Sequence, residues 1–158
     1  MTTTTVYVET TVIGHLVGRI LADPIVAGRQ YATRQWWTTI EAKHRPYASQ
    51  LVADECSAGD PSAAAERLHI VRSIEFLTLT SEAIQLTEQL MAGHAIPSSE
   101  PRDAAHVSLA AIHGIQYLVT WNFKHIANPS TRRIIESICL SAGYTPPTIC
   151  TPDELLEV

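Results

Sequence analysis

The chain has 158 residues, of which 46% are hydrophobic and 17% are charged, and its formal net charge at pH 7 is −5. This composition is typical of a folded globular domain and argues against a disordered or collagen-like chain. Because the protein is acidic, overall attraction would not draw it to a nucleic acid, and binding a polyanion would need a local basic patch or a metal ion.

Length and cysteine usage predict one domain, residues 1–158, in a reducing compartment. Cys56, Cys139 and Cys150 lie far apart without C-x-x-C spacing, and their odd number favours free thiols and a cytoplasmic location. The start of the chain, MTTTTVYVE, lacks the basic and apolar regions of a signal peptide. No apolar run approaches the roughly 18 residues of a membrane span, so we expect no membrane partner.

Short strands are predicted to alternate with helices along the whole chain. The first strand is entirely apolar, as expected of an interior strand, and Asp23-Pro24 begins a helix that is predicted to run to about Lys43. The predicted strands are residues 6–8, 47–52, 76–79, 115–120 and 148–150. The other predicted helices begin near Thr10, Pro61, Ser81, Pro101 and Pro129. This alternation predicts an α/β fold with a mostly parallel sheet.

The stretch from Pro101 to Asn128 carries the strongest local signals. Pro101 suits the first helical position, where its missing N–H would have no partner, and Gly114 is expected to end that helix in a left-handed conformation. The next strand leads directly into a polar loop that contains Asn122, Lys124 and His125. In open α/β sheets, sites form beyond the carboxyl ends of strands.

Four polar residues occupy comparable places beside the predicted strands: Glu9, Glu55, Asp103 and Asn122. A parallel sheet brings such positions to one edge, so we expect them to converge. Two carboxylates about 5 Å apart repel by about 3 kcal/mol at an effective dielectric near 20, so the cluster should titrate upward or recruit a cation. Oxygen ligands suit Mg²⁺ or Mn²⁺, and the chemistry that follows is metal-assisted phosphodiester hydrolysis.

Segments of the chain resemble the PIN-domain family, most of all its VapC-like toxin ribonucleases and their close relatives. The segments are VYVETTVIGHL, SQLVADECSAGD and, most specifically, PRDAAHVSLAAIHGIQYLVTWNFKHIAN. The resemblance covers about Val6 to Cys150. It implies a three-layer α/β/α domain with a central, mostly parallel sheet of four to five short strands.

The same resemblance implies an endoribonuclease that cleaves RNA with Mg²⁺ or Mn²⁺ and a metal-activated water. Matched motif by motif, it assigns Glu9, Glu55, Asp103 and Asn122 as the metal ligands and catalytic residues. It further implies a homodimer and a small antitoxin-type partner that blocks the site.

Two of these positions depart from the family pattern. The first acid, usually aspartate, is the longer Glu9, which can shift a metal by about an ångström, and the fourth, commonly aspartate, is the uncharged Asn122. These departures favour one alternative, a binding or regulatory module with a weakened metal site. A second alternative is a metal-dependent phosphatase of small phosphoesters, although the chain has no G-x-x-x-x-G-K-[ST] or G-x-G-x-x-G segment.

Residues next to the predicted ligands have competing interpretations. Asp54 could replace Glu55, but adjacent helical side chains point about 100° apart and Glu55 matches the family motif. Thr10 or Thr11 could orient Glu9 or bind phosphate, although helix capping is the favoured interpretation.

Other side chains are interpreted mainly as structural. His106 is expected to be a packed, hydrogen-bonded histidine, and Cys56 a small buried hydrophobe. Lys124 and His125 could meet a phosphate or form an exposed, solvated pair. The tryptophans of the helix that contains Trp36 and Trp37 are expected to lie in the core or at a subunit interface, with the nearby cations as a solvated face or a nucleic-acid patch.

Overall fold

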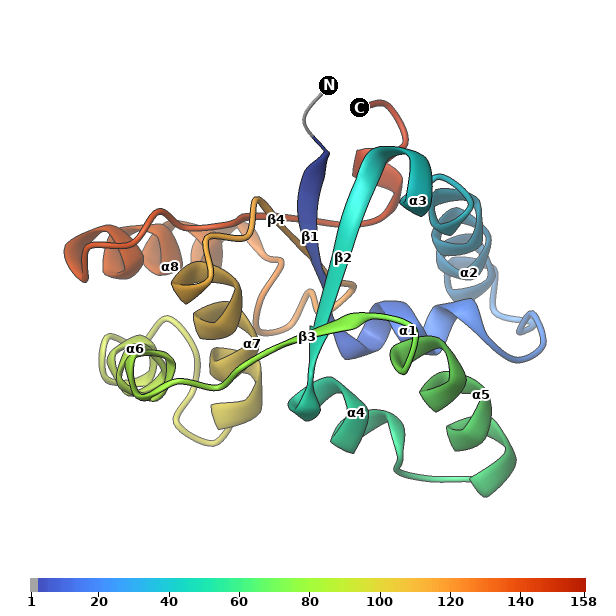
Figure 1. Cartoon of the computed structure of the whole chain (residues 1–158), viewed down its shortest axis with the longest axis horizontal. Helices are drawn as coiled ribbons and strands as arrows, with labels where there is room; N and C mark the ends of the chain where they lie inside the picture. Colours follow the sequence, from blue (N-terminus) through green and yellow to red (C-terminus); the bar gives the residue numbers. More distant parts are fainter. Residues whose placement is uncertain (1–2) are drawn as a thin grey trace.

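A computed structural model describes residues 3–158 and places a sheet of five parallel strands at the centre of the molecule (Figure 1). The strand order is β3-β2-β1-β4-β5. The strands are β1 (Thr4–Val8), β2 (His44–Ser49), β3 (Glu75–Leu77), β4 (Tyr117–Val119) and β5 (Thr148–Cys150). The predicted α/β class and the predicted parallel sheet of short strands are therefore confirmed.

Helices cover both faces of this sheet. They are α1 (Thr10–Leu16), α2 (Pro24–Trp37), α3 (Ile40–Lys43), α4 (Gln50–Cys56), α5 (Pro61–Val71), α6 (Ser81–Ala92), α7 (Pro101–Ile112), α8 (Pro129–Ser141) and the 3-10 turn η1 (Asp153–Leu155). Helices α6, α7 and α8 lie on one side of the strands and α1, α2 and α5 on the other, which gives three layers (Figure 1). Between residues 3 and 158, no helix combines the length and the apolar character needed to cross a membrane.

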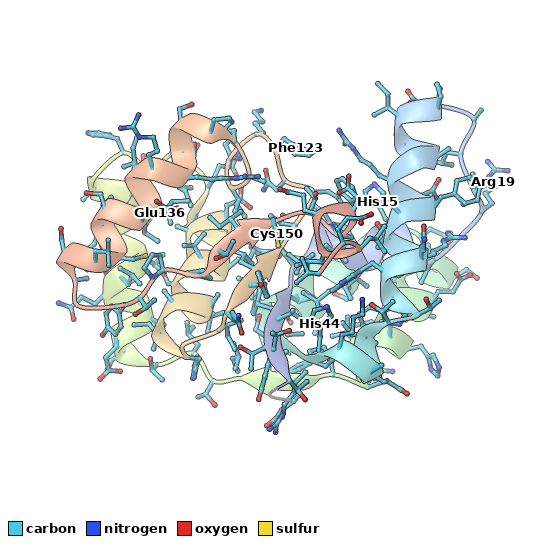
Figure 2. The ribbon with its side chains drawn as sticks, turned by 90° about the horizontal axis from the view of Figure 1, so that it is seen from above. His15, Arg19, His44, Phe123, Glu136 and Cys150 are labelled. Carbon is cyan, nitrogen blue, oxygen red and sulfur yellow. The ribbon has the colours of Figure 1, made fainter. Side chains whose placement is uncertain are left out.

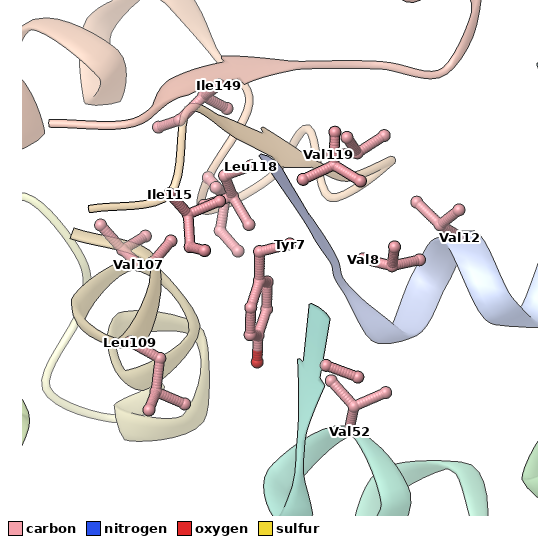
Figure 3. Packing of buried hydrophobic residues seen from close by; sticks show 14 of the residues in the cluster. Tyr7, Val8, Val12, Val52, Val107, Leu109, Ile115, Leu118, Val119 and Ile149 are labelled. Carbon is pink, nitrogen blue, oxygen red and sulfur yellow. The ribbon is translucent and has the colours of Figure 1, made fainter. Parts of the chain in front are cut away.

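The core is built around β1. Val6, Tyr7 and Val8 are fully buried, as expected for a central strand that is covered on both faces. Figure 3 shows the Tyr7 ring between Leu109 of α7 and Val52 of α4. Burying side chains of this size contributes roughly 1.5–3 kcal/mol each, so the middle of the sheet supplies much of the stability.

Several element boundaries follow the local signals of the sequence. Asp23, Asp60 and Asn128 each precede a proline at the first helical position, and the side chain of each accepts a hydrogen bond from the first turn of its helix. Gly114 has a φ of +66° just after α7, the left-handed conformation predicted for the residue that ends this helix.

Other boundaries differ from the prediction. The helix expected from Pro24 to Lys43 breaks at Thr38 and Thr39, whose hydroxyls donate to carbonyl oxygens of the preceding turn at 2.6 and 2.7 Å. Such local bonds compete with the helical ladder.

The second and third strands are also shifted from their predicted places. β2 begins at His44 and ends at Ser49, because the Ser49 hydroxyl accepts from the Val52 N–H and caps α4. The end of the predicted strand 47–52 is therefore helical. β3 covers Glu75–Leu77 rather than residues 76–79, and Thr80 rather than Ser81 caps α6.

The strand order creates a switch point at the carboxyl ends of β1 and β4. From β1 the chain builds outward through β2 to β3, whereas β4 and β5 lie on the opposite side of β1. Crossovers of opposite direction leave a crevice where the two halves meet, and ligands of open α/β sheets bind there. Glu9 follows β1 directly, and Thr120 to Asn122 follow β4.

Candidate metal site at the carboxyl edge of the sheet

Glu9 joins the two halves of the sheet at the switch point. Its side chain is only 3% exposed. Its carboxylate accepts hydrogen bonds from the Thr11 N–H at 3.1 Å, the Thr11 hydroxyl at 2.6 Å and the Thr120 hydroxyl at 2.5 Å. Glu9 is the N-cap of α1, and its own N–H donates to the Val119 oxygen of β4. We call Glu9, Thr11 and Thr120 the Glu9 clasp.

Glu55 is held by a second group of hydrogen bonds. Its Oε1 accepts from the Thr10 hydroxyl at 2.8 Å and lies 2.6 Å from His106 Nε2. His106 Nδ1 lies 2.7 Å from the Tyr7 hydroxyl, which lies 2.8 Å from the Ser49 hydroxyl. One proton arrangement satisfies this chain: Ser49 donates to Tyr7, Tyr7 to His106, and His106 to the Glu55 carboxylate.

Two sequence interpretations are settled by these contacts. His106 is fully buried, so the prediction of a packed, hydrogen-bonded histidine is confirmed. The consecutive threonines are not simple helix caps, because Thr11 orients Glu9 and Thr10 orients Glu55. The cap is Glu9 itself, and the positive N-terminal end of α1 favours a carboxylate at this position.

The electrostatics keep Glu55 ionised. Burial by itself would raise the pKa of Glu55, but the hydrogen bonds from His106 and Thr10, with the charge of Arg102, lower the pKa below its ordinary value of 4.5. The expected upward titration is therefore not found at Glu55. Cys56 is buried, as predicted, and burial raises the pKa of its thiol to about 11.

A cluster with the composition of a metal site forms around Asp103. Glu100, Asp103 and His125 each offer one ligand atom, and these atoms lie within 4.8 Å of one another. All three side chains are half-buried, and His125 Nδ1 lies 2.8 Å from Asp103 Oδ2. Glu100 occupies the N-cap position of α7, yet its side chain makes no capping hydrogen bond. We call Glu100, Asp103 and His125 the Asp103 triad.

Asn122 builds the turn that carries His125 to the triad. Its Oδ1 accepts from the His125 N–H at 3.0 Å, and its backbone oxygen accepts from the N–H groups of Ile126 and Ala127. The Asn122 N–H in turn donates to the Thr120 hydroxyl of the Glu9 clasp. Asn122 therefore links the clasp to the triad through the loop after β4.

The structure gathers the predicted residues at one edge but divides them between different groups of contacts. Asp103 belongs to the triad, Glu55 contacts His106 one helical turn after Asp103, and Glu9 lies within the clasp. Within residues 3–158, the carboxylates of Glu9, Glu55 and Asp103 do not come within 4.8 Å of one another as a set, whereas the ligand atoms of the Asp103 triad do. Metal binding by Glu9, Glu55 and Asn122 stays a prediction.

Sequence reasoning missed Glu100 and underrated His125. Glu100 stands directly before Pro101 and three residues before Asp103, a spacing that can bring two carboxylates to the same side of a helix start. Of the two interpretations of His125 and Lys124, the exposed pair is wrong for His125, which is half-buried against Asp103, whereas Lys124 is exposed. Contact of these residues with a phosphate stays a prediction. Nothing local in the sequence indicates Thr120 as a partner of Glu9, because the two residues are 111 positions apart.

The donor set of the triad suits a divalent cation. Two carboxylate oxygens are ligands that Mg²⁺ and Mn²⁺ prefer, and an imidazole nitrogen adds a ligand that transition metals accept more readily than Mg²⁺ does. The triad can therefore hold a metal ion.

Comparison with known proteins gives no match: no protein-family model, curated protein or solved structure corresponds to this chain. The contacts and charges of the site residues therefore carry the functional interpretation, together with the motifs of the sequence.

Proposed function

We propose that this protein is a metal-dependent endoribonuclease of the toxin–antitoxin type, which hydrolyses RNA phosphodiesters with Mg²⁺ or Mn²⁺. The observation that carries the proposal is the Asp103 triad, which places two carboxylates and an imidazole within 4.8 Å beside the end of β4. A divalent cation held there would polarise a phosphodiester and supply hydroxide from bound water. The resemblance of residues 101–128 to the VapC-like ribonucleases supports the same chemistry.

The residues of this chain would divide the work. Glu100, Asp103 and His125 would hold the cation through two carboxylates and an imidazole, and the hydrogen bond from His125 to Asp103 keeps these two side chains together. Glu55, which the hydrogen bonds from His106 and Thr10 keep ionised, would add negative charge at the same edge and would serve as the proton acceptor for the attacking water. Glu9 fixes the position of the loop after β4.

Calorimetry with Mn²⁺ tests the cation site first. We expect wild type to bind Mn²⁺, and Asp103→Asn and Glu100→Gln to bind at least about tenfold more weakly, because each removes a charged ligand. Asp54→Asn is the matched control, since Asp54 is an exposed acid whose carboxylate, within residues 3–158, accepts a hydrogen bond only from Gln50 of the same helix. The absence of Mn²⁺ binding by wild type at millimolar metal would overturn the proposal.

An RNA cleavage assay tests the reaction. Wild type with Mn²⁺ should produce defined fragments from a structured RNA, and chelation of the metal or Asp103→Asn should abolish them. Glu55→Gln separates the roles of the acids: we expect cleavage to fall by about 10²-fold or more, while Mn²⁺ binding to the triad persists. Hydrolysis of a small phosphoester without cleavage of RNA would indicate a phosphatase instead.

One observation favours a second candidate, a binding or regulatory module with a weakened site. Three hydrogen bonds already occupy the Glu9 carboxylate, and Asn122 uses its side-chain oxygen within its own loop. Two of the four predicted ligands are thus engaged in structural bonds. Binding of Mn²⁺ and RNA without any cleavage would identify this module.

The resemblance also supports a cytoplasmic homodimer that a small antitoxin protein inhibits. Trp36 cannot supply the contact surface, because it is fully buried in the core. Among the large apolar residues of the same helix, Ile25 and Tyr31 are exposed. Light scattering on the purified protein, with Tyr31→Ser as the variant, tests whether this face of α2 joins two copies.

A further inference from the structure

Beside the metal site, an arginine lies against two aromatic rings. The guanidinium carbon of Arg29 is 5.0 Å from the ring centroid of Phe123 and 5.6 Å from that of Trp121. The two rings lie edge to face, with centroids 6.1 Å apart. The two distances from Arg29 to the rings, 5.0 and 5.6 Å, are within the range of a cation–π interaction. We call Arg29, Trp121 and Phe123 the cation–aromatic cluster.

Trp121 connects this cluster to the Glu9 clasp. Its backbone N–H donates to the Thr11 hydroxyl at 2.9 Å, and its indole N–H donates to the Thr33 hydroxyl at 2.8 Å. Thr33 lies one turn beyond Arg29 on α2, and its hydroxyl also donates to the Arg29 backbone oxygen. The cluster is therefore fixed to the same strand end that carries Asn122 and His125.

Arg29 is a cation without a neutralising partner in the described part of the chain. The ion pairs of residues 3–158 do not include it, and its guanidinium makes no hydrogen bond there. Arg34, by contrast, donates to the backbone oxygens of His15, Val17 and Gly18. Its guanidinium therefore stabilises the end of α1 and the residues that follow. The N–H groups of Arg29 remain available to an anionic ligand.

Phe123 presents its ring to the solvent next to this cation. Its side chain is 41% exposed, and the following residue, Lys124, is exposed as well. Figure 2 shows Phe123 at the rim of the molecule, between α2 and the helix that carries Glu136. An exposed ring beside a free guanidinium matches the two parts of a nucleotide, a flat base and a phosphate.

We propose that the cation–aromatic cluster binds one nucleotide of single-stranded RNA beside the bond to be cleaved, with the base stacked on Phe123 and a phosphate on Arg29. The choice of RNA rests on the proposed ribonuclease function. Because the net charge of the chain is −5, affinity for RNA must come from local features of this kind. An acidic peptide could also pair with Arg29, but its carboxylates would not stack on the exposed ring of Phe123.

Fluorescence anisotropy with a labelled single-stranded RNA of roughly 12 nucleotides tests the cluster. The titration is done in a chelator, so that binding is measured without cleavage. We expect Phe123→Leu and Arg29→Gln each to weaken binding about tenfold, and Phe123→Tyr to retain it, because tyrosine keeps the ring. In Arg29→Gln, the slope of log affinity against log salt should also shrink by about 0.7, whereas Phe123→Leu should leave the slope unchanged.

Strands β2 and β3, on the other side of β1 from β4, provide matched control residues. Phe76 is 39% exposed, close to the value for Phe123, and Arg45 lies 5.5 Å from the Tyr47 ring but is ion-paired with Glu75. Phe76→Leu and Arg45→Gln should therefore bind RNA as wild type does. Circular dichroism of each variant verifies that it is folded before binding is compared.

The possible outcomes test RNA binding by the cation–aromatic cluster separately from the proposed ribonuclease activity. Wild-type affinity in Phe123→Leu and Arg29→Gln overturns the cluster, even if metal-dependent cleavage is found. Failure of wild type to bind RNA, with an acidic peptide bound at Arg29 instead, overturns it in favour of a protein partner. Binding that depends on the cluster, without any cleavage in Mn²⁺, upholds the cluster and overturns the ribonuclease function.

Discussion

The Glu9 clasp and the Asp103 triad lie at the same edge of the sheet, but their carboxylates are used in different ways. Glu9 is 3% exposed and accepts three hydrogen bonds from Thr11 and Thr120. Asp103 is half-buried, and in the described part of the chain its carboxylate has one hydrogen-bond partner, His125. A carboxylate has about four acceptor positions, so Glu9 has little capacity left and Asp103 has most of its own.

The comparison shows that the donors around an acid, more than its position at a strand end, decide its role. A buried carboxylate is tolerated where donors surround it, and the same donors reduce its availability to a cation. A carboxylate beside other ligands and water keeps that availability. Substitutions at the two sites should therefore separate stability from metal binding.

The largest effect on stability is expected from Glu9→Gln. The amide would direct its N–H groups toward hydroxyl and backbone donors, leaving buried groups unsatisfied at a cost of about 3 kcal/mol. Urea unfolding measures this loss. A loss below about 0.5 kcal/mol would show that the clasp does not stabilise the fold as its geometry indicates.

Thr120→Val removes one donor of the clasp and should cost about 1.5–2 kcal/mol, since a hydrogen bond to a charged group is lost. Thr148→Val is the control, because Thr148 is an exposed strand residue, and it should change the free energy of unfolding by less than about 0.5 kcal/mol. Equal effects of the two substitutions would contradict the special role of Thr120.

Glu55 should contribute a pH-dependent stability. The hydrogen bonds of His106 and Thr10 outweigh burial and lower the pKa of Glu55 in the folded protein, so the unfolded state binds the proton more readily. This contribution is complete above the ordinary value of 4.5 and is lost as pH falls through the lower, folded value.

Urea unfolding of wild type and Glu55→Gln, from neutral pH down to about pH 3, measures the contribution. The free-energy difference between the two proteins should shrink as the pH falls. A constant difference would mean that the charge of Glu55 adds nothing to folding.

The smallest effect is expected at Asp103. In a chelator, Asp103→Asn should lower the free energy of unfolding by about 1 kcal/mol or less, because only the bond to His125 changes in a half-buried setting. Thermal melting with and without Mn²⁺ sharpens the comparison, since the metal should raise the Tm of wild type but not that of the variant. If Asp103→Asn lowered the free energy of unfolding as much as Glu9→Gln does, the triad would be a stabilising contact of the fold rather than a metal site.

The sequence by itself determined the α/β class, the start of α7 at Pro101, its end at Gly114 and the strand β5 at residues 148–150. Each of these depends on local signals, such as a proline that fits the first helical turn or a run of β-forming residues between turns. The same reasoning predicted His106 as a packed, hydrogen-bonded histidine, and His106 is fully buried.

Only the tertiary structure decided how the acids are used. The bond from Thr120 to Glu9 spans 111 residues, and the bond from His106 to Glu55 spans 51. The sequence contains the acids but not the donors that will surround them, because those donors come from other strands and helices. An acid next to a strand is a ligand or a clasp according to these distant partners, and folding alone brings them together.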